Sequence, residues 1–232
     1  KRGIEMTKFD CQPLGDQAVV LTFGQTIDET VHVNIQQALQ AIQAANFPWV
    51  IDIVPSYTTI CVYYDVVQIA LMYNHLPYKF VVDSLLALNI VKSTERHTSI
   101  IEIPVLYGGE DGPDLSYVAS YCGLTEDDVI LRHTSCEYKV HMLGFLPGFP
   151  YLSGLDETIA VPRKEVPSAL VRAGSVGIAG QQTGIYPLDS PGGWQIIGRT
   201  TLPLFDVTKT PPNTIQAGDT IKFVAIRGDI ND

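Results

Sequence analysis

The residues best suited to chemistry gather in two segments of the second half of the chain. The first runs from residue 144 to 152 as Gly-Phe-Leu-Pro-Gly-Phe-Pro-Tyr-Leu and is followed by Pro162-Arg163. The second runs from residue 174 to 187 and continues from 190 to 200 as Ser-Pro-Gly-Gly-Trp-Gln-Ile-Ile-Gly-Arg-Thr. Glycine lets a neighbouring strand or a ligand approach the backbone closely, and the interleaved polar side chains hydrogen-bond an amide or a carboxylate. We therefore place the candidate site in these segments.

Five polar side chains of these segments are candidates for contacting a ligand. Taken one at a time, each has a plainer role in a turn or on the surface, and the glycines alone fit the tight turns of a β-barrel. Their density in a short stretch favours a site. We predict that they converge on one concave face: Arg163, Gln182, Tyr186, Gln195 and Arg199. The two arginines are assigned catalytic roles as charged donors, and the other three are assigned to substrate binding.

Aromatic side chains beside the polar set form the predicted apolar wall of the site. Phe149 and Tyr151 are assigned to substrate binding at its rim, with Phe145 and Trp194 nearby. Packing in the core or in a loop is the alternative for each of them. His133 is the third catalytic candidate, because an imidazole titrates near neutral pH and serves as a general base. The alternative for His133 is a hydrogen-bonded structural histidine.

Composition excludes several classes of partner. The formal net charge is -10 at pH 7 and the sequence has no dense run of lysine and arginine, so it lacks the electrostatic attraction that drives binding to nucleic acid or to anionic membranes. No apolar stretch approaches the roughly 20 residues that cross a bilayer, and residues 1–10 lack the apolar core of a secretory signal. We therefore expect a cytoplasmic protein that binds neither nucleic acid nor membranes.

Metal and nucleotide motifs are also missing from the sequence. The four cysteines form no CxxC pair and the histidines show no HxxxH spacing beside an acid, so no metal is expected. The sequence contains no phosphate-binding GxxxxGKS/T loop, no GxGxxG after a strand and no GxSxG nucleophile elbow. A self-contained ATPase, dehydrogenase or serine hydrolase is therefore not indicated.

Hydrophobic spacing predicts the elements that position these residues. In the first half, Thr26 and Glu29 have the spacing of a capping box, and apolar residues then recur every three or four positions, which predicts a helix packed on a sheet. The apolar face of this helix consists of Ile27, Val31, Ile35, Ala38, Ile42 and Ala45. Strands are predicted at 17–23, 49–54 and 58–64, and a second helix at 77–89. Together they make a small α/β unit.

The second half has a different pattern. A polar stretch without periodicity precedes a strand predicted at 100–106, so we place a boundary near residue 95 and divide the chain into domains 1–95 and 96–232. Two short helices are predicted at 114–121 and 129–133, the second entered through Thr125 with Asp128 at the capping-box distance. From residue 137, short apolar runs alternate with glycine and proline, which is typical of a β-barrel or sandwich. The predicted fold class is α+β.

The two segments that hold the candidate site also carry a resemblance. The block from Gly144 to Leu152 with Pro162-Arg163, and the block from Gly174 to Thr200, resemble the signature of the KipI or allophanate-hydrolase-subunit-1 family, whose members include the B subunits of 5-oxoprolinase. The match is tight over residues 137–200 and extends in outline over the rest. This resemblance implies an N-terminal α/β domain followed by a cyclophilin-like β-barrel domain.

The resemblance also implies a function. It points to one component of an ATP-dependent enzyme that hydrolyses 5-oxo-L-proline to L-glutamate, with no activity in the isolated chain and ATP as a cofactor of the complex. Its implied partners are the C subunit of 5-oxoprolinase, from the allophanate-hydrolase-subunit-2 family, and the A subunit. The alternative within the family is an inhibitor that binds a sensor histidine kinase and blocks its autophosphorylation. A third alternative is a carbohydrate or peptide binder on the barrel, with Trp194 and Tyr186 as stacking platforms.

Two positions depart from the family pattern. A second Pro-Arg pair usually follows the first, whereas this chain has Pro167-Ser168, and a proline is common where Arg172 stands. Loss of a guanidinium at position 168 weakens a carboxylate or phosphate clamp, because serine cannot replace the bidentate contact of arginine. Arg172 restores that charge only if its side chain reaches the same place.

Overall fold

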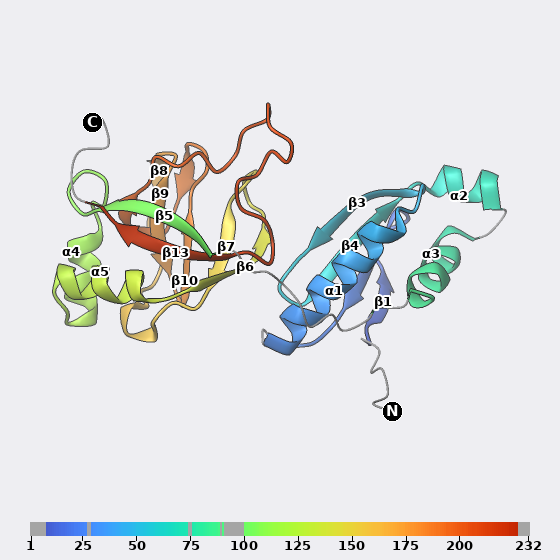
Figure 1. Ribbon diagram of the computed structural model, residues 1–232, viewed down its shortest axis with the longest axis horizontal. Coiled ribbons are helices and arrows are strands. Elements are labelled where there is room, and N and C mark those ends of the chain that lie inside the picture. Colours follow the sequence, from blue (N-terminus) through green and yellow to red (C-terminus); the bar gives the residue numbers. More distant parts are fainter. Residues whose placement is uncertain (1–7, 27–28, 74–75, 89, 91–99, 227–232) are drawn as a thin grey trace. The chain divides into compact units, whose positions relative to one another are not determined.

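The chain forms two compact units, residues 1–97 and 98–232 (Figure 1). The computed structural model describes residues 8–26, 29–73, 76–88, 90 and 100–226. The domain boundary predicted near residue 95 lies in the segment 91–99, outside the described residues, and stays a prediction. Each unit has a hydrophobic core of its own. No helix in the described part of the chain has the length and apolar character needed to span a membrane.

A four-stranded antiparallel sheet, in the order β1-β2-β4-β3, forms the centre of the N-terminal unit. Its strands are β1 (Asp10–Pro13), β2 (Ala18–Thr22), β3 (Val50–Pro55) and β4 (Thr59–Tyr64). The helices of this unit are α1 (Glu29–Ala45), α2 (Val66–Tyr73) and α3 (Pro77–Leu86). The three strands and two helices predicted in this half are found as β2, β3, β4, α1 and α3, whereas β1 and α2 were not predicted.

Helix α1 packs one apolar face on this sheet (Figure 1). Its buried positions on that face include Val31, Ile35, Ala38 and Ile42. The apolar stripe is therefore confirmed over these four residues. The predicted cap at Thr26 adjoins residues 27–28, which lie outside the described residues, and it stays a prediction.

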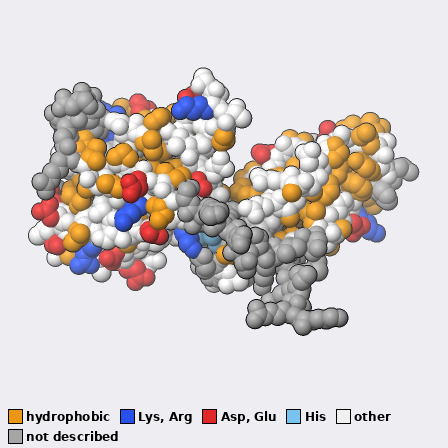
Figure 2. All heavy atoms as spheres, in the orientation of Figure 1, with side chains coloured by type: hydrophobic (Ala, Val, Ile, Leu, Met, Phe, Trp, Pro, Cys, Tyr) orange, Lys and Arg blue, Asp and Glu red, His pale blue; other side chains and the backbone are white. Residues whose placement is uncertain are grey.

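Apolar side chains also gather on the surface of the N-terminal unit (Figure 2). Helix α2 contains no charged residue and exposes Val67, Leu71 and Met72, of which Leu71 is 80% exposed. An apolar helix surface of this kind is typical of a region that contacts another molecule or another part of a protein.

A closed barrel of seven strands forms the C-terminal unit, in the order β10-β7-β6-β13-β5-β12-β9. Its strands are β5 (Ile100–Tyr107), β6 (Tyr138–Leu143), β7 (Pro150–Ser153), β9 (Ser175–Ala179), β10 (Gln182–Ile185), β12 (Gln195–Arg199) and β13 (Thr220–Ala225). Strand β13 pairs with β5 in parallel. A separate ribbon joins β8 (Ser168–Val171) and β11 (Ser190–Gly192). The predicted α+β class with a closed barrel is confirmed.

Two helices and one short 3-10 helix accompany the barrel: α4 (Leu115–Cys122), α5 (Glu126–Ser135) and η1 (Glu157–Ile159). The capping box predicted for α5 is confirmed, because Thr125 Oγ1 accepts from the Asp128 amide at 3.1 Å while Asp128 Oδ2 accepts from the Thr125 amide at 3.1 Å. These paired bonds satisfy amide groups that the first turn of a helix leaves without a partner. Helix α5 therefore begins at Glu126, three positions before the predicted start.

Candidate functional site

Phe149 is the centre of an aromatic cluster on the barrel wall. Its ring lies edge-on to Tyr186 at 5.2 Å and to Trp194 at 5.5 Å, and it is tilted against Tyr151 at 5.1 Å. Phe145 adds a further edge contact at 5.6 Å. Edge-on pairs bring the positive rim of one ring to the negative face of the other, which stabilises the arrangement beyond simple burial. The cluster is therefore a small apolar core, in which Phe149, Tyr186 and Trp194 are buried.

Two glycines explain how Trp194 reaches this cluster. Gly177 and Gly184 are cross-strand partners in β9 and β10. A Cβ atom on Gly184 would lie 3.0 Å from the indole of Trp194, and one on Gly177 would lie 3.1 Å from the Trp194 Cβ. The indole thus lies on bare backbone, where a side chain would displace it. The sequence predicted that a strand or a ligand approaches the backbone of the glycine-rich segment. In the structure the Trp194 side chain makes this approach.

A pocket of about 240 Å³, which we call the aromatic pocket, opens beside the cluster. It is lined by Phe145, Phe149, Tyr151, Arg163, Pro167, Tyr186, Pro191, Gly192, Gly193 and Trp194. The guanidinium carbon of Arg163 lies 5.9 Å from the centre of the Trp194 ring, within the range of a cation–π interaction. Aromatic side chains beside a positive charge suit a ligand that has an apolar part and a carboxylate.

Two neighbouring segments hold Arg163 in the aromatic pocket. The Lys164 amide donates to the Gly193 carbonyl at 2.7 Å, and Gln195 Nε2 donates to the Pro162 carbonyl at 3.1 Å. Gln195 is buried, and its side-chain amide donates to a backbone carbonyl of this chain. It therefore positions Arg163 and does not line the pocket, in contrast to its predicted contact with substrate.

Tyr186 presents a neutral phenol to the aromatic pocket. Burial raises the pKa of Tyr186, and a hydrogen bond from the Trp194 backbone and the charge of Arg163 partly offset that rise. The hydroxyl is therefore protonated at neutral pH and available as a hydrogen-bond donor.

Phe145 has a backbone conformation that side chains rarely adopt. Its φ is +70° and its side chain is 64% exposed at the mouth of the aromatic pocket. A left-handed conformation costs a non-glycine residue roughly 1–2 kcal/mol, and such strain concentrates at functional sites. This backbone strain is a second, independent feature of the same pocket.

His133 lies in the barrel interior, away from both the aromatic pocket and solvent. Its Nδ1 is 2.7 Å from the Tyr107 hydroxyl and its Nε2 is 2.9 Å from Thr183 Oγ1, which donates to the Gly177 carbonyl at 3.0 Å. Thr183 therefore accepts from Nε2–H, and Tyr107 donates to an unprotonated Nδ1. Burial lowers the pKa of His133 to about 3. This placement fits the structural alternative and not the general base, because a substrate does not reach a fully buried ring.

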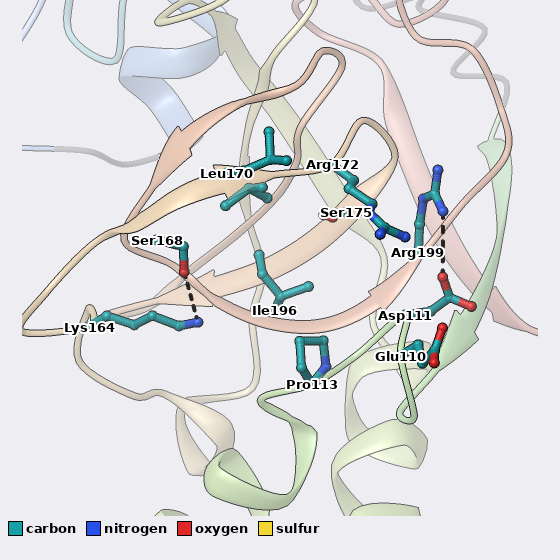
Figure 3. Close-up of a pocket in the computed structure, with 11 residues that line it drawn as sticks. Glu110, Asp111, Pro113, Lys164, Ser168, Leu170, Arg172, Ser175, Ile196 and Arg199 are labelled. Carbon is teal, nitrogen blue, oxygen red and sulfur yellow. Dashed lines mark hydrogen bonds and ion pairs between the residues drawn. The ribbon is translucent and has the colours of Figure 1, made fainter.

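Arg199 lines a second pocket, of about 430 Å³, and not the aromatic pocket (Figure 3). Its Nε donates to the Ala173 carbonyl at 3.0 Å, and its Nη1 is 3.7 Å from Asp111 Oδ1. Gln182, at the start of β10, lines neither pocket. Strand geometry explains why Arg199 and Gln195, both on β12, lie near different pockets. An extended strand rises about 3.3 Å per residue, which separates Gln195 from Arg199 by about 13 Å.

The predicted convergence is thus only partial. The aromatic pocket brings together Phe149, Tyr151, Arg163 and Tyr186. Gln195 supports it from beneath, whereas Arg199 and Gln182 lie elsewhere and His133 is inside the barrel.

An acidic loop that the sequence analysis did not select completes the second pocket. Asp114 Oδ2 lies 2.6 Å from Lys164 Nζ and accepts from the Ile196 amide at 2.7 Å, while Glu110 and Asp111 line the pocket itself. The available signal was the dense mixture of glycine and acidic residues at 108–114, immediately after a predicted strand.

Comparisons with known proteins agree with the sequence blocks. Residues 9–215 match the family model described as carboxyltransferase domain, subdomain C and D. The B subunit of the Bacillus subtilis 5-oxoprolinase is 44% identical over 94% of this chain and 93% of the relative, and that of Escherichia coli O157:H7 is 40% identical over 94% and 97%. The chain belongs to the family of 5-oxoprolinase B subunits.

A solved structure has a similar fold. The crystal structure of TTHA0988 is 33% identical and superposes with a TM-score of 0.80 over 92% of this chain, which spans 41% of the length of that protein. The resemblance first indicated by residues 144–163 and 174–200 is confirmed by the curated relatives and the family model.

The two departures from the family pattern lie at opposite ends of the second pocket (Figure 3). Ser168, at the start of β8, and Arg172, just after its end, both line this pocket. Arg172 therefore adds its charge to the end of the pocket that holds Arg199, and not to the end where a guanidinium at position 168 would lie. Within the described residues no group of three or more histidine, cysteine, aspartate or glutamate side chains is placed to hold a metal ion.

Proposed function

We propose that the chain acts as one subunit of an ATP-dependent complex that hydrolyses 5-oxo-L-proline to L-glutamate. The observation that carries this proposal is the identity of 44% and 40%, over 94% of the chain, with two proteins named as the B subunit of 5-oxoprolinase. The exposed apolar residues of α2 are consistent with a chain that works in an assembly.

The aromatic pocket is the proposed substrate site. A 5-oxoproline ring is a nearly planar lactam with one carboxylate, so its ring packs on the aromatic cluster while Arg163 binds the carboxylate. Tyr186 and Tyr151 supply phenol groups at the same surface. Because this ring is held on rigid aromatic residues, the chain contributes orientation of the lactam toward the groups that attack it.

ATP is assigned to the complex and not to this chain. A lactam carbonyl is a poor electrophile, and transfer of a phosphoryl group to its oxygen makes the ring carbon reactive, which is a chemical reason for coupling to ATP. The sequence contains no phosphate-binding loop. The A and C subunits of 5-oxoprolinase are the proposed partners that supply this chemistry, and the closed barrel is assigned to the cyclophilin-like type on the family resemblance.

Co-expression tests this function. The chain is purified with the products of the candidate genes for its A and C partners, and 5-oxoproline-dependent ATP hydrolysis is measured in the complex and in the isolated chain. We expect turnover only in the complex. Turnover by the chain alone would contradict the subunit role, and a chain that forms no such complex but blocks autophosphorylation of a sensor histidine kinase would favour the inhibitor alternative.

A further inference from the structure

One end of the second pocket holds charges of both signs. In Figure 3 the side chain of Arg172 extends toward Arg199, beside Asp111 and Glu110. Two cationic and two anionic groups therefore share one end of the same hollow.

The rest of the pocket has a different character. An apolar floor of Pro113, Leu170 and Ile196 occupies its middle, and Lys164 and Ser168 lie at the end opposite the arginines (Figure 3). Lys164 Nζ is 3.3 Å from Ser168 Oγ. The pocket is thus polar at both ends and apolar between them.

The two arginines are held together by a tightly fixed loop. The Ala173 amide donates to Asp189 Oδ1 at 2.7 Å, and the Ala173 carbonyl accepts from Arg199 Nε at 3.0 Å. Gly174 follows with a φ of +84°, and a Cβ there would overlap the Thr200 carbonyl. The backbone that carries Arg172 is therefore fixed against the strand that carries Arg199.

The charged groups at this end are matched in number but make few direct contacts with one another. Arg199 meets Asp111 only at 3.7 Å, beyond hydrogen-bonding distance. The guanidinium of Arg172 makes no hydrogen bond or ion pair with any of the residues described. The planar donors of the two guanidinium groups match the geometry of a carboxylate.

We propose that the second pocket binds a free acidic α-amino acid. The two guanidinium groups hold its α-carboxylate, and Glu110 and Asp111 hold its α-ammonium group. The carbon chain lies on the apolar floor, and the side-chain carboxylate points toward the end that holds Ser168 and Lys164, where Lys164 also pairs with Asp114 at 2.6 Å. Such a ligand uses the charged groups at the arginine end of the pocket and its apolar middle.

The choice of amino acid rests on the proposed function. Hydrolysis of 5-oxoproline breaks the ring C–N bond, adds the oxygen of water to the carbonyl carbon as a new carboxylate, and releases the ring nitrogen as an ammonium group. Only the product, L-glutamate, carries the ammonium that Glu110 and Asp111 recognise. The pocket is therefore selective for product over substrate. Its occupancy by L-glutamate would rise as the product accumulates.

Calorimetric titration of the full chain tests this pocket. L-glutamate, glutarate, 5-oxo-L-proline and inorganic phosphate are compared at low and high salt. We expect L-glutamate to bind most tightly and salt to weaken it. Arg172→Ala and Arg199→Ala should each reduce its affinity about ten-fold, since each removes a charged hydrogen bond at a partly exposed site. Glu110→Gln should weaken L-glutamate but leave glutarate unchanged, because glutarate has no ammonium group.

Lys209→Ala is the matched control, because Lys209 is an exposed cation outside both pockets, and L-glutamate affinity should be unchanged. Thermal unfolding confirms that each variant folds. Absence of saturable L-glutamate binding, equal affinity in Arg172→Ala, or binding of phosphate alone overturns the proposal. A complex that turns over 5-oxoproline while the chain binds no L-glutamate overturns only this inference, whereas binding without turnover in any complex overturns only the proposed function.

Discussion

At the scale of single residues, Arg163 is the side chain on which the proposed substrate site most depends. Its guanidinium lies over Trp194 at the aromatic pocket and is free to bind a carboxylate in bidentate fashion. In the assembled complex, Arg163→Ala should raise KM for 5-oxoproline about ten-fold, because it removes a charged hydrogen bond, with a smaller change in kcat. Steady-state kinetics measure both constants.

Arg163→Lys is the paired variant for this test. Lysine keeps the charge but lacks the planar fork, so its KM should lie between those of the wild type and Arg163→Ala. A KM that is unchanged in both variants would remove Arg163 from the substrate site.

His133 makes a separate prediction about pH. Its folded pKa of about 3 lies below the ordinary value of 6.5 because of burial, so the unfolded chain binds a proton more readily. The stabilising contribution of neutral His133 is complete above pH 6.5 and falls as the pH drops from 6.5 toward 3. Between these pH values His133 lowers the free energy of unfolding by about 1.4 kcal/mol for each pH unit.

Denaturant unfolding of the wild type and of His133→Gln between pH 7 and 4 isolates this share, since the other titrating groups are common to both proteins. The wild type should show the steeper decline. NMR of the imidazole provides a check that does not depend on the variant folding, because the ring should stay neutral at pH 5. A ring that titrates near 6.5 in the folded protein would contradict the buried network.

Two adjacent glycines of the aromatic pocket make a prediction at the scale of the elements. A Cβ on Gly192, at the end of β11, would overlap the hydroxyl of Tyr186, which is held between Phe149 and Trp194. A Cβ on Gly193 would lie 3.7 Å from its nearest neighbour, an ordinary contact. Gly192→Ala should therefore destabilise the protein by about 1–3 kcal/mol through overpacking, whereas Gly193→Ala should be close to neutral. Thermal and chemical unfolding of both variants measure the difference.

The elements also show what the sequence was able to predict. Helix α1 was predicted because its apolar residues repeat at the helical period and face one sheet. Helix α2 was not, because Val66–Tyr73 is short and almost entirely apolar, with Gln68 as its one amide side chain, and shows no such period. Strand β1 was missed because Asp10 and Pro13 are unusual in strands. Periodicity therefore predicted the elements that bury one face and missed those that do not.

The candidate site was predicted in part for a related reason. The sequence showed that aromatic and guanidinium groups share two segments, and the pocket around Phe149 contains four of the predicted residues. It did not show that Gln195 and Arg199 lie at opposite ends of β12, or that His133 is directed into the barrel. Those facts depend on strand register and on helix packing, which residues far apart in the sequence decide.

At the scale of the whole molecule, the two cores predict independent folding. The N-terminal core is built from β2, β4 and the helices α1 to α3, and the C-terminal core fills a barrel whose strands all lie after residue 98. In the barrel, the last strand, β13, pairs with the first, β5, so the sheet closes on itself within residues 98–232. A unit that closes its own sheet and buries its own apolar residues has the hydrophobic core and the paired strands that a domain needs to fold alone.

We therefore expect residues 98–232 to fold when expressed alone. The fragment should unfold cooperatively, and its amide NMR spectrum should overlay the barrel resonances of the full chain. Barrel amides in β5, β9 and β13 should keep similar protection against hydrogen exchange in both, because the same backbone bonds must open. The matched experiment uses residues 1–97, whose sheet has β1 and β3 as its edge strands among the described residues, and which should be the less soluble piece. If residues 98–232 stay unfolded at neutral pH while the full chain unfolds in one transition, the barrel needs the N-terminal unit to form and the prediction is wrong.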